Sequence, residues 1–221
     1  MEEFHKSWER FSSERTLEFG GHTDASWKGS HSVSACLVIP IDDEKFRDRL
    51  EPLRDALRPF PFVSLHPDHF MHITLAPIGF PVDEPSEEDE ISWSKLDEVE
   101  ENARDALSGM SPFPLTLANL NAFPAAAFVE VHSEDGSLGE LCDKLRRIPG
   151  LGKTSSLPHL TLAYFHALEG SEAPDALVSA IEKHRDWPVA EIEAKEVKVS
   201  LLELDSEYPR PEARARIKLG R

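Results

Sequence analysis

The chain has 221 residues, of which 40% are hydrophobic and 29% charged, so it can bury a core of its own as a single two-lobed domain. Its 41 acidic and 24 basic residues give a formal net charge of −17. Because contacts to a nucleic-acid backbone depend on clustered Lys and Arg, this balance argues against a general binder of long duplex nucleic acid.

Two features of the sequence bear on the cellular compartment of the protein. Residues 1–30 are mostly polar and contain no apolar h-region, and no stretch approaches the ~18 apolar residues of a membrane helix. The two cysteines, Cys36 and Cys142, do not make a disulfide framework and are interpreted as free thiols in a reducing compartment. We therefore expect a cytoplasmic protein without a membrane anchor, and a monomer.

Residues 1–32 form an N-terminal extension to a main domain that spans 33–221. The spacing of Phe4, Trp8 and Phe11 predicts a short helix, and Gly20 and Gly21 predict that this helix does not continue beyond them. The aromatic residues indicate that the extension packs on the body of the protein, where it is placed to cover part of a groove.

The main domain begins with an apolar run over residues 34–41, which predicts a central strand. Asp42 and Asp43 suit the start of a helix whose apolar positions include Phe46, Leu50 and Leu57. Pro52 falls inside this helix and predicts a kink or a break.

A strand pattern then occurs twice. His72-Ile-Thr-Leu-Ala and His159-Leu-Thr-Leu-Ala share the order His-apolar-Thr-Leu-Ala. Since strand side chains alternate between faces, His72 and Thr74 share one face, and His159 and Thr161 share one face in the second copy. Each copy predicts a strand with an apolar back and a polar front that carries one imidazole and one hydroxyl.

Between and after the two copies, further elements follow a regular order. An acidic segment, 81–101, begins as a loop and ends in a helix with an apolar stripe. Two strands (114–121 and 125–132) and a helix (138–148) precede a loop in which Lys153 is a candidate phosphate contact. A helix (174–185) and two closing strands follow the second copy, and the last strand carries a row of Arg and Lys. The order predicts a mixed α+β fold in which each half holds one motif strand.

Strict alternation beyond the second motif places Phe165 on the face of His159, which makes it a candidate for stacking on a base. Core packing is the alternative for this side chain. Tyr164 is expected on the opposite, apolar face.

The two motif strands together fit phosphodiester chemistry. Hydrolysis needs a base for the attacking oxygen and an acid for the leaving oxygen, and imidazole serves either role near neutral pH. Hydroxyls can donate hydrogen bonds to the phosphate oxygens where charge develops. We therefore predict His72 and His159 as catalytic residues and Thr74 and Thr161 as substrate contacts, with no metal or cofactor required.

A metal site is the competing interpretation of the first motif. His66, His69 and His72 lie within seven residues together with Asp68, and such clusters can bind zinc. A spacing of three brings imidazoles together on a helix, whereas the pattern from Met71 onward is that of a strand. We therefore expect His66 and His69 on a loop that enters the strand.

The paired motifs, His72-Ile-Thr-Leu and His159-Leu-Thr-Leu, resemble the two-histidine (2H) phosphoesterase superfamily, and in style its LigT-like 2'-5' RNA ligase and cyclic phosphodiesterase branch. The resemblance covers roughly residues 33–221. It implies a bilobal fold of two antiparallel sheets with outer helices, internal pseudo-two-fold symmetry and a metal-independent site between the lobes. Many LigT-like proteins have an arginine after the second motif, where this chain has Tyr164.

The resemblance implies cleavage of 2',3'-cyclic phosphates of nucleotides or RNA ends, or of 2'-5' linkages, with reversible ligation. By likeness to plant-type relatives, His159 is assigned as the base and His72 as the acid. Two alternatives stay open: a module on the same fold that binds a nucleotide or RNA end without turnover, and a zinc hydrolase built on the three clustered histidines.

Overall fold

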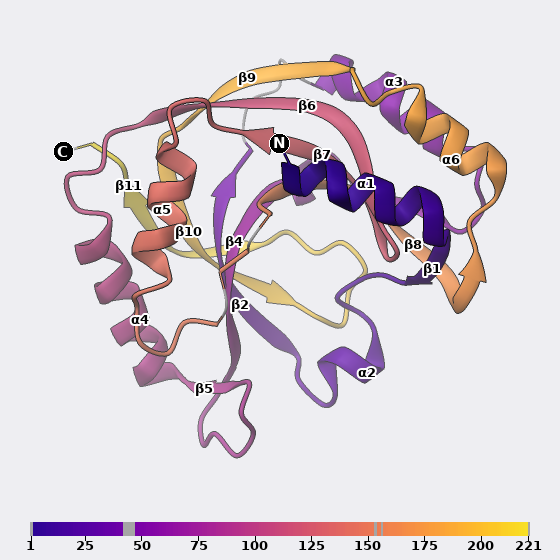
Figure 1. The fold of residues 1–221 in the computed structure, drawn as a ribbon. Helices are drawn as coiled ribbons and strands as arrows, with labels where there is room; N and C mark the ends of the chain where they lie inside the picture. The colour runs from indigo at the N-terminus through magenta and orange to yellow at the C-terminus, as the bar shows by residue number, and fades with distance from the viewer. Residues whose placement is uncertain (1, 42–46, 153, 156, 221) are drawn as a thin grey trace.

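A computed structural model describes residues 2–41, 47–152, 154–155 and 157–220. Within them the strands form a curled, mainly antiparallel sheet in the order β11-β10-β2-β4-β8-β7-β6-β9, with helices on its outside (Figure 1). The predicted mixed α+β class is confirmed. The expected helix start at Asp42 and Asp43, together with Phe46, lies outside the described residues.

The main path of the sheet divides into two halves of four strands. The first half contains β2 (Val33–Pro40), β4 (His72–Val82), β10 (Glu196–Glu203) and β11 (Glu212–Lys218). The second half contains β6 (Phe113–Phe123), β7 (Ala126–His132), β8 (His159–Glu172) and β9 (Pro188–Ala194). Three short strands lie off this path: β1 (Thr16–Phe19) and β3 (Val63–Leu65) pair with β8, and β5 (Glu90–Ser92) pairs with β4. The hairpin β6–β7 and the closing pair β10–β11 are the strands expected from alternation.

The helices cover the sheet on two flanks (Figure 1). One flank holds α4 (Trp93–Ala106) beside α5 (Ser137–Leu145), and the other holds α3 (Arg47–Leu57) beside α6 (Asp175–Glu182). Of the predicted kink or break at Pro52, the break does not occur, because α3 continues through this residue. Leu50, Leu53 and Leu57 are fully buried on its inner face, and this packing holds the helix together across the proline. No helix in the described ranges is long and apolar enough to cross a membrane.

The two halves meet at a single point of strand pairing. β4 and β8 run antiparallel, and Ile73 lies opposite Leu160. Both side chains are fully buried. Because neighbouring residues in a strand point to opposite faces, the residues that flank this pair lie together on the other face. The two predicted sheets are therefore joined into one continuous sheet by the pairing of β4 with β8, which places both motifs at its centre.

The N-terminal segment is built into the second half. Helix α1 (Glu2–Glu14) packs on β6, with Phe4 and Phe11 buried. The Asn121 amide donates to the Phe4 carbonyl at 2.9 Å. Strand β1 adds to β8, and the short helix α2 (Ala25–Lys28) follows before β2 begins. The expected packing of this segment on the body is what the structure shows.

Candidate functional site

Both motif strands contain a β-bulge at the same position. Against β2, the pairing of β4 shifts so that Leu75 has no partner. Against β7, the pairing of β8 shifts so that Leu162 has none. In each strand the leucine and the following alanine are both buried, so the alternation of faces reverses after them. The repeated Leu-Ala is therefore where each motif strand bends.

The second bulge corrects the prediction for the residues beyond the motif. Phe165 is fully buried, with ring centroids 6.3 Å from Phe11 and 6.2 Å from Phe62, so it forms part of the core and is not exposed for stacking. Tyr164, expected on the apolar face, instead lines a cavity together with His72. The candidate phosphate contact Lys153 lies outside the described residues.

The two motif histidines are held in the same way. Nδ1 of His72 lies 2.7 Å from the Phe70 carbonyl oxygen, and Nδ1 of His159 lies 2.8 Å from the Leu157 carbonyl oxygen. A carbonyl only accepts hydrogen bonds, so Nδ1 carries the proton in both rings. In the neutral rings Nε2 is then the nitrogen with a free lone pair. Each imidazole is therefore oriented by the backbone two residues before it and can exchange a proton through Nε2.

The loops that enter the motifs are exchanged between the halves. The His66 amide, ahead of the first motif, donates to the carbonyl of Leu162 at 2.9 Å. The Ser155 amide, ahead of the second motif, donates to the carbonyl of Leu75 at 2.7 Å. Both acceptors are the bulged leucines, whose backbone the regular ladder leaves unpaired. Each bulge thus anchors the loop that leads to the other histidine.

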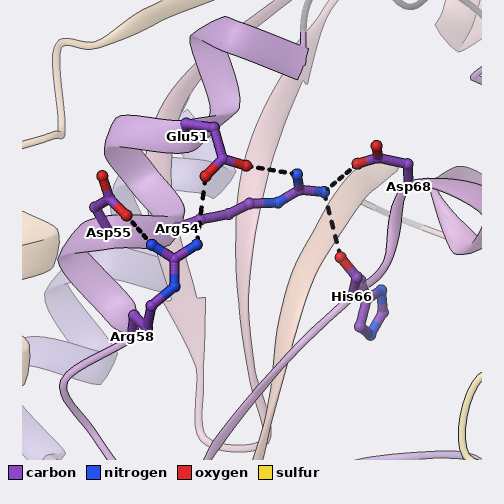
Figure 2. A network of polar contacts seen from close by, with 6 residues as sticks. All are labelled: Glu51, Arg54, Asp55, Arg58, His66 and Asp68. Atoms are coloured by element: carbon purple, nitrogen blue, oxygen red, sulfur yellow. Dashed lines mark hydrogen bonds and ion pairs between the residues drawn. The ribbon is translucent and has the colours of Figure 1, made fainter.

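An arginine from the preceding helix also holds each loop. Figure 2 shows Arg54 of α3 reaching across to the loop ahead of His72. Its guanidinium donates to the Asp68 carboxylate at 2.7 Å, to the His66 carbonyl at 3.3 Å and to Glu51 at 2.9 Å. In the second half, Arg146 donates from Nε to the Thr154 hydroxyl at 3.1 Å. The two arginines differ in burial, since the side chain of Arg54 is 10% exposed and that of Arg146 is 56% exposed.

Burial lowers the pKa of both motif histidines. For His72, desolvation is opposed by the Phe70 carbonyl, and the positive charge of His22 lowers the pKa further. For His159, desolvation is opposed by the Leu157 carbonyl, and the charge of His72 lowers the pKa further. The two imidazoles therefore lie close enough for the charge of one to disfavour protonation of the other.

Two cavities flank the motif histidines. His72 and Thr74 line one of about 510 Å³, whose walls also include His22, Trp27 and Tyr164. His159 lines another of about 440 Å³, whose walls include Lys6 and Arg10 of α1 and Ser155. Thr161 is partly exposed on the same face of β8 as His159. The structure thus places His72, Thr74, His159 and Thr161 together at the junction of the two halves.

The clustered histidines do not form the alternative metal site. His66 is 3% exposed and is surrounded by the rings of Phe70, Tyr164 and Tyr208. His69 is directed elsewhere, with Nε2 3.0 Å from the Tyr208 carbonyl. Over the described ranges, the residues whose potential metal-ligand atoms all lie within 4.8 Å of one another are His31, Glu87 and Glu90.

Comparison with known proteins decides the family. A model described as the 2'-5' RNA ligase superfamily matches residues 42–205. The chain belongs to this superfamily. Its members are enzymes of the phosphoesterase and RNA-ligase type. A search of curated proteins finds no match.

Several solved structures share the fold of this superfamily member. They include E. coli LigT complexed with NADP+ (17% identity, TM-score 0.62, covering 87% of this chain and 100% of that one) and TT0787 of Thermus thermophilus (20%, 0.59, 84% and 97%). A third is described as a phosphoesterase (18%, 0.60, 85% and 99%). Identities this low support the shared fold alone. The match extends over nearly the whole of each relative, so the fold expected from the two motifs is confirmed.

Reasoning from the sequence missed three groups around the site: Tyr164, Arg54 and His22. Tyr164 was assigned to the wrong face because a bulge is not visible in hydrophobic alternation. The one available signal was the repetition of Leu-Ala after both threonines. Arg54 and His22 contact the site from distant segments, and neither carries a local pattern that identifies it.

Proposed function

We propose that the protein is a metal-independent phosphodiesterase that hydrolyses 2',3'-cyclic phosphates of nucleotides or RNA ends through His72 and His159. The observation that carries this proposal is the matching presentation of the two imidazoles, each with Nδ1 on a backbone carbonyl and Nε2 left for proton exchange. The complexes of E. coli LigT with phosphate, 3'-AMP and ATP support a small phosphorylated ligand for this fold.

In the proposed reaction, Nε2 of His159 accepts a proton from water as the water oxygen attacks phosphorus. The bond from phosphorus to one ribose oxygen breaks, and Nε2 of His72 donates its proton to that oxygen. In this assignment His72 holds the proton before the reaction and His159 is neutral. The product is a nucleoside monophosphate, and the solvent returns the proton from His159 to His72.

Thr74 and Thr161 would donate hydrogen bonds to the two non-bridging phosphate oxygens. They lie one strand period beyond each histidine and on the same face, so each imidazole and its hydroxyl are directed to one side of the junction. Hydrogen-bond donors placed where charge develops stabilise the transition state more than the ground state. Run in reverse, the same residues would serve 2'-5' ligation with the two histidines exchanging roles.

The test is incubation with a panel of 2',3'-cyclic nucleotides and short RNAs ending in a cyclic phosphate, in the presence of EDTA. We expect a nucleoside monophosphate or phosphorylated RNA end, and the position of its phosphate identifies the leaving oxygen. Activity that appears only when a divalent metal is added would overturn the mechanism. Saturable binding without product would instead establish a nucleotide-binding module on this fold.

A further inference from the structure

Much of the wall of the cavity beside His72 comes from a segment outside the family match. Residues 19–22, Asp24 and Trp27 line it, whereas the family model covers residues 42–205. The segment is held firmly. The Gly20 amide donates to the Phe165 carbonyl at 2.7 Å, and a Cβ at Gly20 would lie 2.0 Å from the Ala125 oxygen. This wall is therefore a rigid addition made by the N-terminal segment.

The wall exposes aromatic surface. Trp27 is 49% exposed and Phe19 43%, and both are large hydrophobic side chains that line the cavity. The Trp27 ring lies edge-on to Phe80, with centroids 5.2 Å apart and planes at 63°. Exposed aromatic faces at a cavity mouth are suited to stacking on planar ligands.

The charge of the wall excludes a second phosphate. Among its described lining residues there is no Lys or Arg, and two of them, Asp24 and Asp89, are acidic. His22 is 6% exposed, and its Nε2 lies 2.7 Å from the Ser206 carbonyl. Its Nδ1 is therefore an acceptor, and it is buried without a partner among the described residues. A wall that offers acceptors calls for a ligand that presents N–H donors.

We propose that this cavity binds the base of the nucleotide, and that it selects a purine with an exocyclic amino group. The phosphate would lie at His72 and Thr74, which line the same cavity, so the attached nucleoside extends toward Trp27. A volume of about 510 Å³ accommodates a purine nucleoside. The inference rests on the proposed function only for the place of the phosphate.

Calorimetric titration with adenosine 3'-monophosphate, uridine 3'-monophosphate and inorganic phosphate tests this directly. We expect the adenosine ligand to bind most tightly. Trp27→Ala should weaken its binding about tenfold, because stacking on an aromatic ring is lost. Trp27→Phe should restore most of that affinity, and neither substitution should change the affinity for inorganic phosphate.

Leu168→Ala is the matched control, since Leu168 is 85% exposed and lines neither cavity. Equal affinity for the adenosine and uridine ligands, or no effect of Trp27→Ala, would overturn the base site. A thermal melt confirms that each variant is folded. If adenosine 3'-monophosphate binds with Trp27 dependence but no cyclic phosphate is hydrolysed, the base site stands and the proposed function fails.

Discussion

His72 and His159 lie in matching backbone but in different surroundings. Each follows an arginine-held loop, precedes a threonine and a bulged leucine, and places Nδ1 on a carbonyl two residues back. Around this shared frame, the lining of the His72 side includes Trp27 and Tyr164, with no Lys or Arg among its described residues. The lining of the His159 side includes Lys6 and Arg10, which are paired with Glu3 and Glu14. The two halves thus share the backbone geometry that presents each imidazole for proton exchange. They differ in the residues that line the cavity beside each imidazole.

The buried neighbours differ in the same way. His22 and His66 lie close enough to His72 for their charges to interact, and burial lowers the pKa of both. Opposite His159 in the sheet is Glu130, which is 2% exposed. Burial alone would raise its pKa, but bonds from His132 and Asn119 and the charge of Arg185 lower it to about 2. One half therefore holds imidazoles whose burial disfavours their charged forms, and the other holds a buried carboxylate with charged and hydrogen-bonding partners.

The largest expected effect tests whether the two histidines are equivalent in catalysis. His72→Ala and His159→Ala should each reduce kcat for a cyclic phosphate by about 10²- to 10⁴-fold, because each removes one proton-transfer group. His69→Ala is the control, since this exposed ring contacts the Tyr208 carbonyl away from the motif. Near-native turnover by either motif variant, with an unchanged melt, would refute the two-histidine mechanism.

The two arginines that hold the loops, Arg54 and Arg146, should contribute unequally to the free energy of unfolding. Arg54→Met should lower the free energy of unfolding by about 2 kcal/mol, because it removes the charged hydrogen bonds of a buried guanidinium to Asp68 and the His66 carbonyl. Arg146→Met should cost less than about 1 kcal/mol, since that side chain is mostly exposed. Urea unfolding measures both. Equal losses would show that burial does not distinguish the two loops.

The threonine hydroxyls test where the phosphate lies between the halves. Thr74→Val and Thr161→Val should each lower kcat by about 10²-fold with a smaller change in KM, as expected for donors that act in the transition state. Thr116→Val on β6 is the control, because that residue pairs with His132 in a strand that carries neither motif. An effect of Thr74 alone would place the phosphate on the His72 side.

Much of this arrangement was predictable from local patterns. The motif strands, the α+β order and the polar face shared by His72 and Thr74 follow from alternation, which the burial of Ile73 and Leu75 confirms. Alternation failed beyond Leu162, because one unpaired residue reverses every face that follows it. That single reversal buries Phe165 and places Tyr164 at the cavity.

Contacts between distant segments could not be predicted in this way. Nothing near Arg54 in the sequence indicates that it holds Asp68, and nothing near Trp27 places it beside His72. Both depend on how the curled sheet brings α3 and the N-terminal segment to one junction. Pairing of this kind is set by tertiary packing, which single-sequence patterns do not contain.

The smallest expected effect separates the roles of the two histidines by pH. With His159 as base, kcat/KM rises with pH through the pKa of His159, and with His72 as acid it falls with pH through the pKa of His72. Since burial lowers both pKa values from 6.5, the maximum should lie below pH 6.5.

His22→Gln removes an imidazole whose protonated form lowers the pKa of His72, so that pKa should rise. If His72 is the acid, the alkaline limb of the kcat/KM profile moves to higher pH and the acid limb stays in place. His184→Gln is the control, because the His184 ring is hydrogen-bonded to the Ala180 carbonyl near the end of α6. This substitution should move neither limb. Movement of the acid limb in His22→Gln would reverse the assignment, because it would make His72 the group that must lose its proton before reaction.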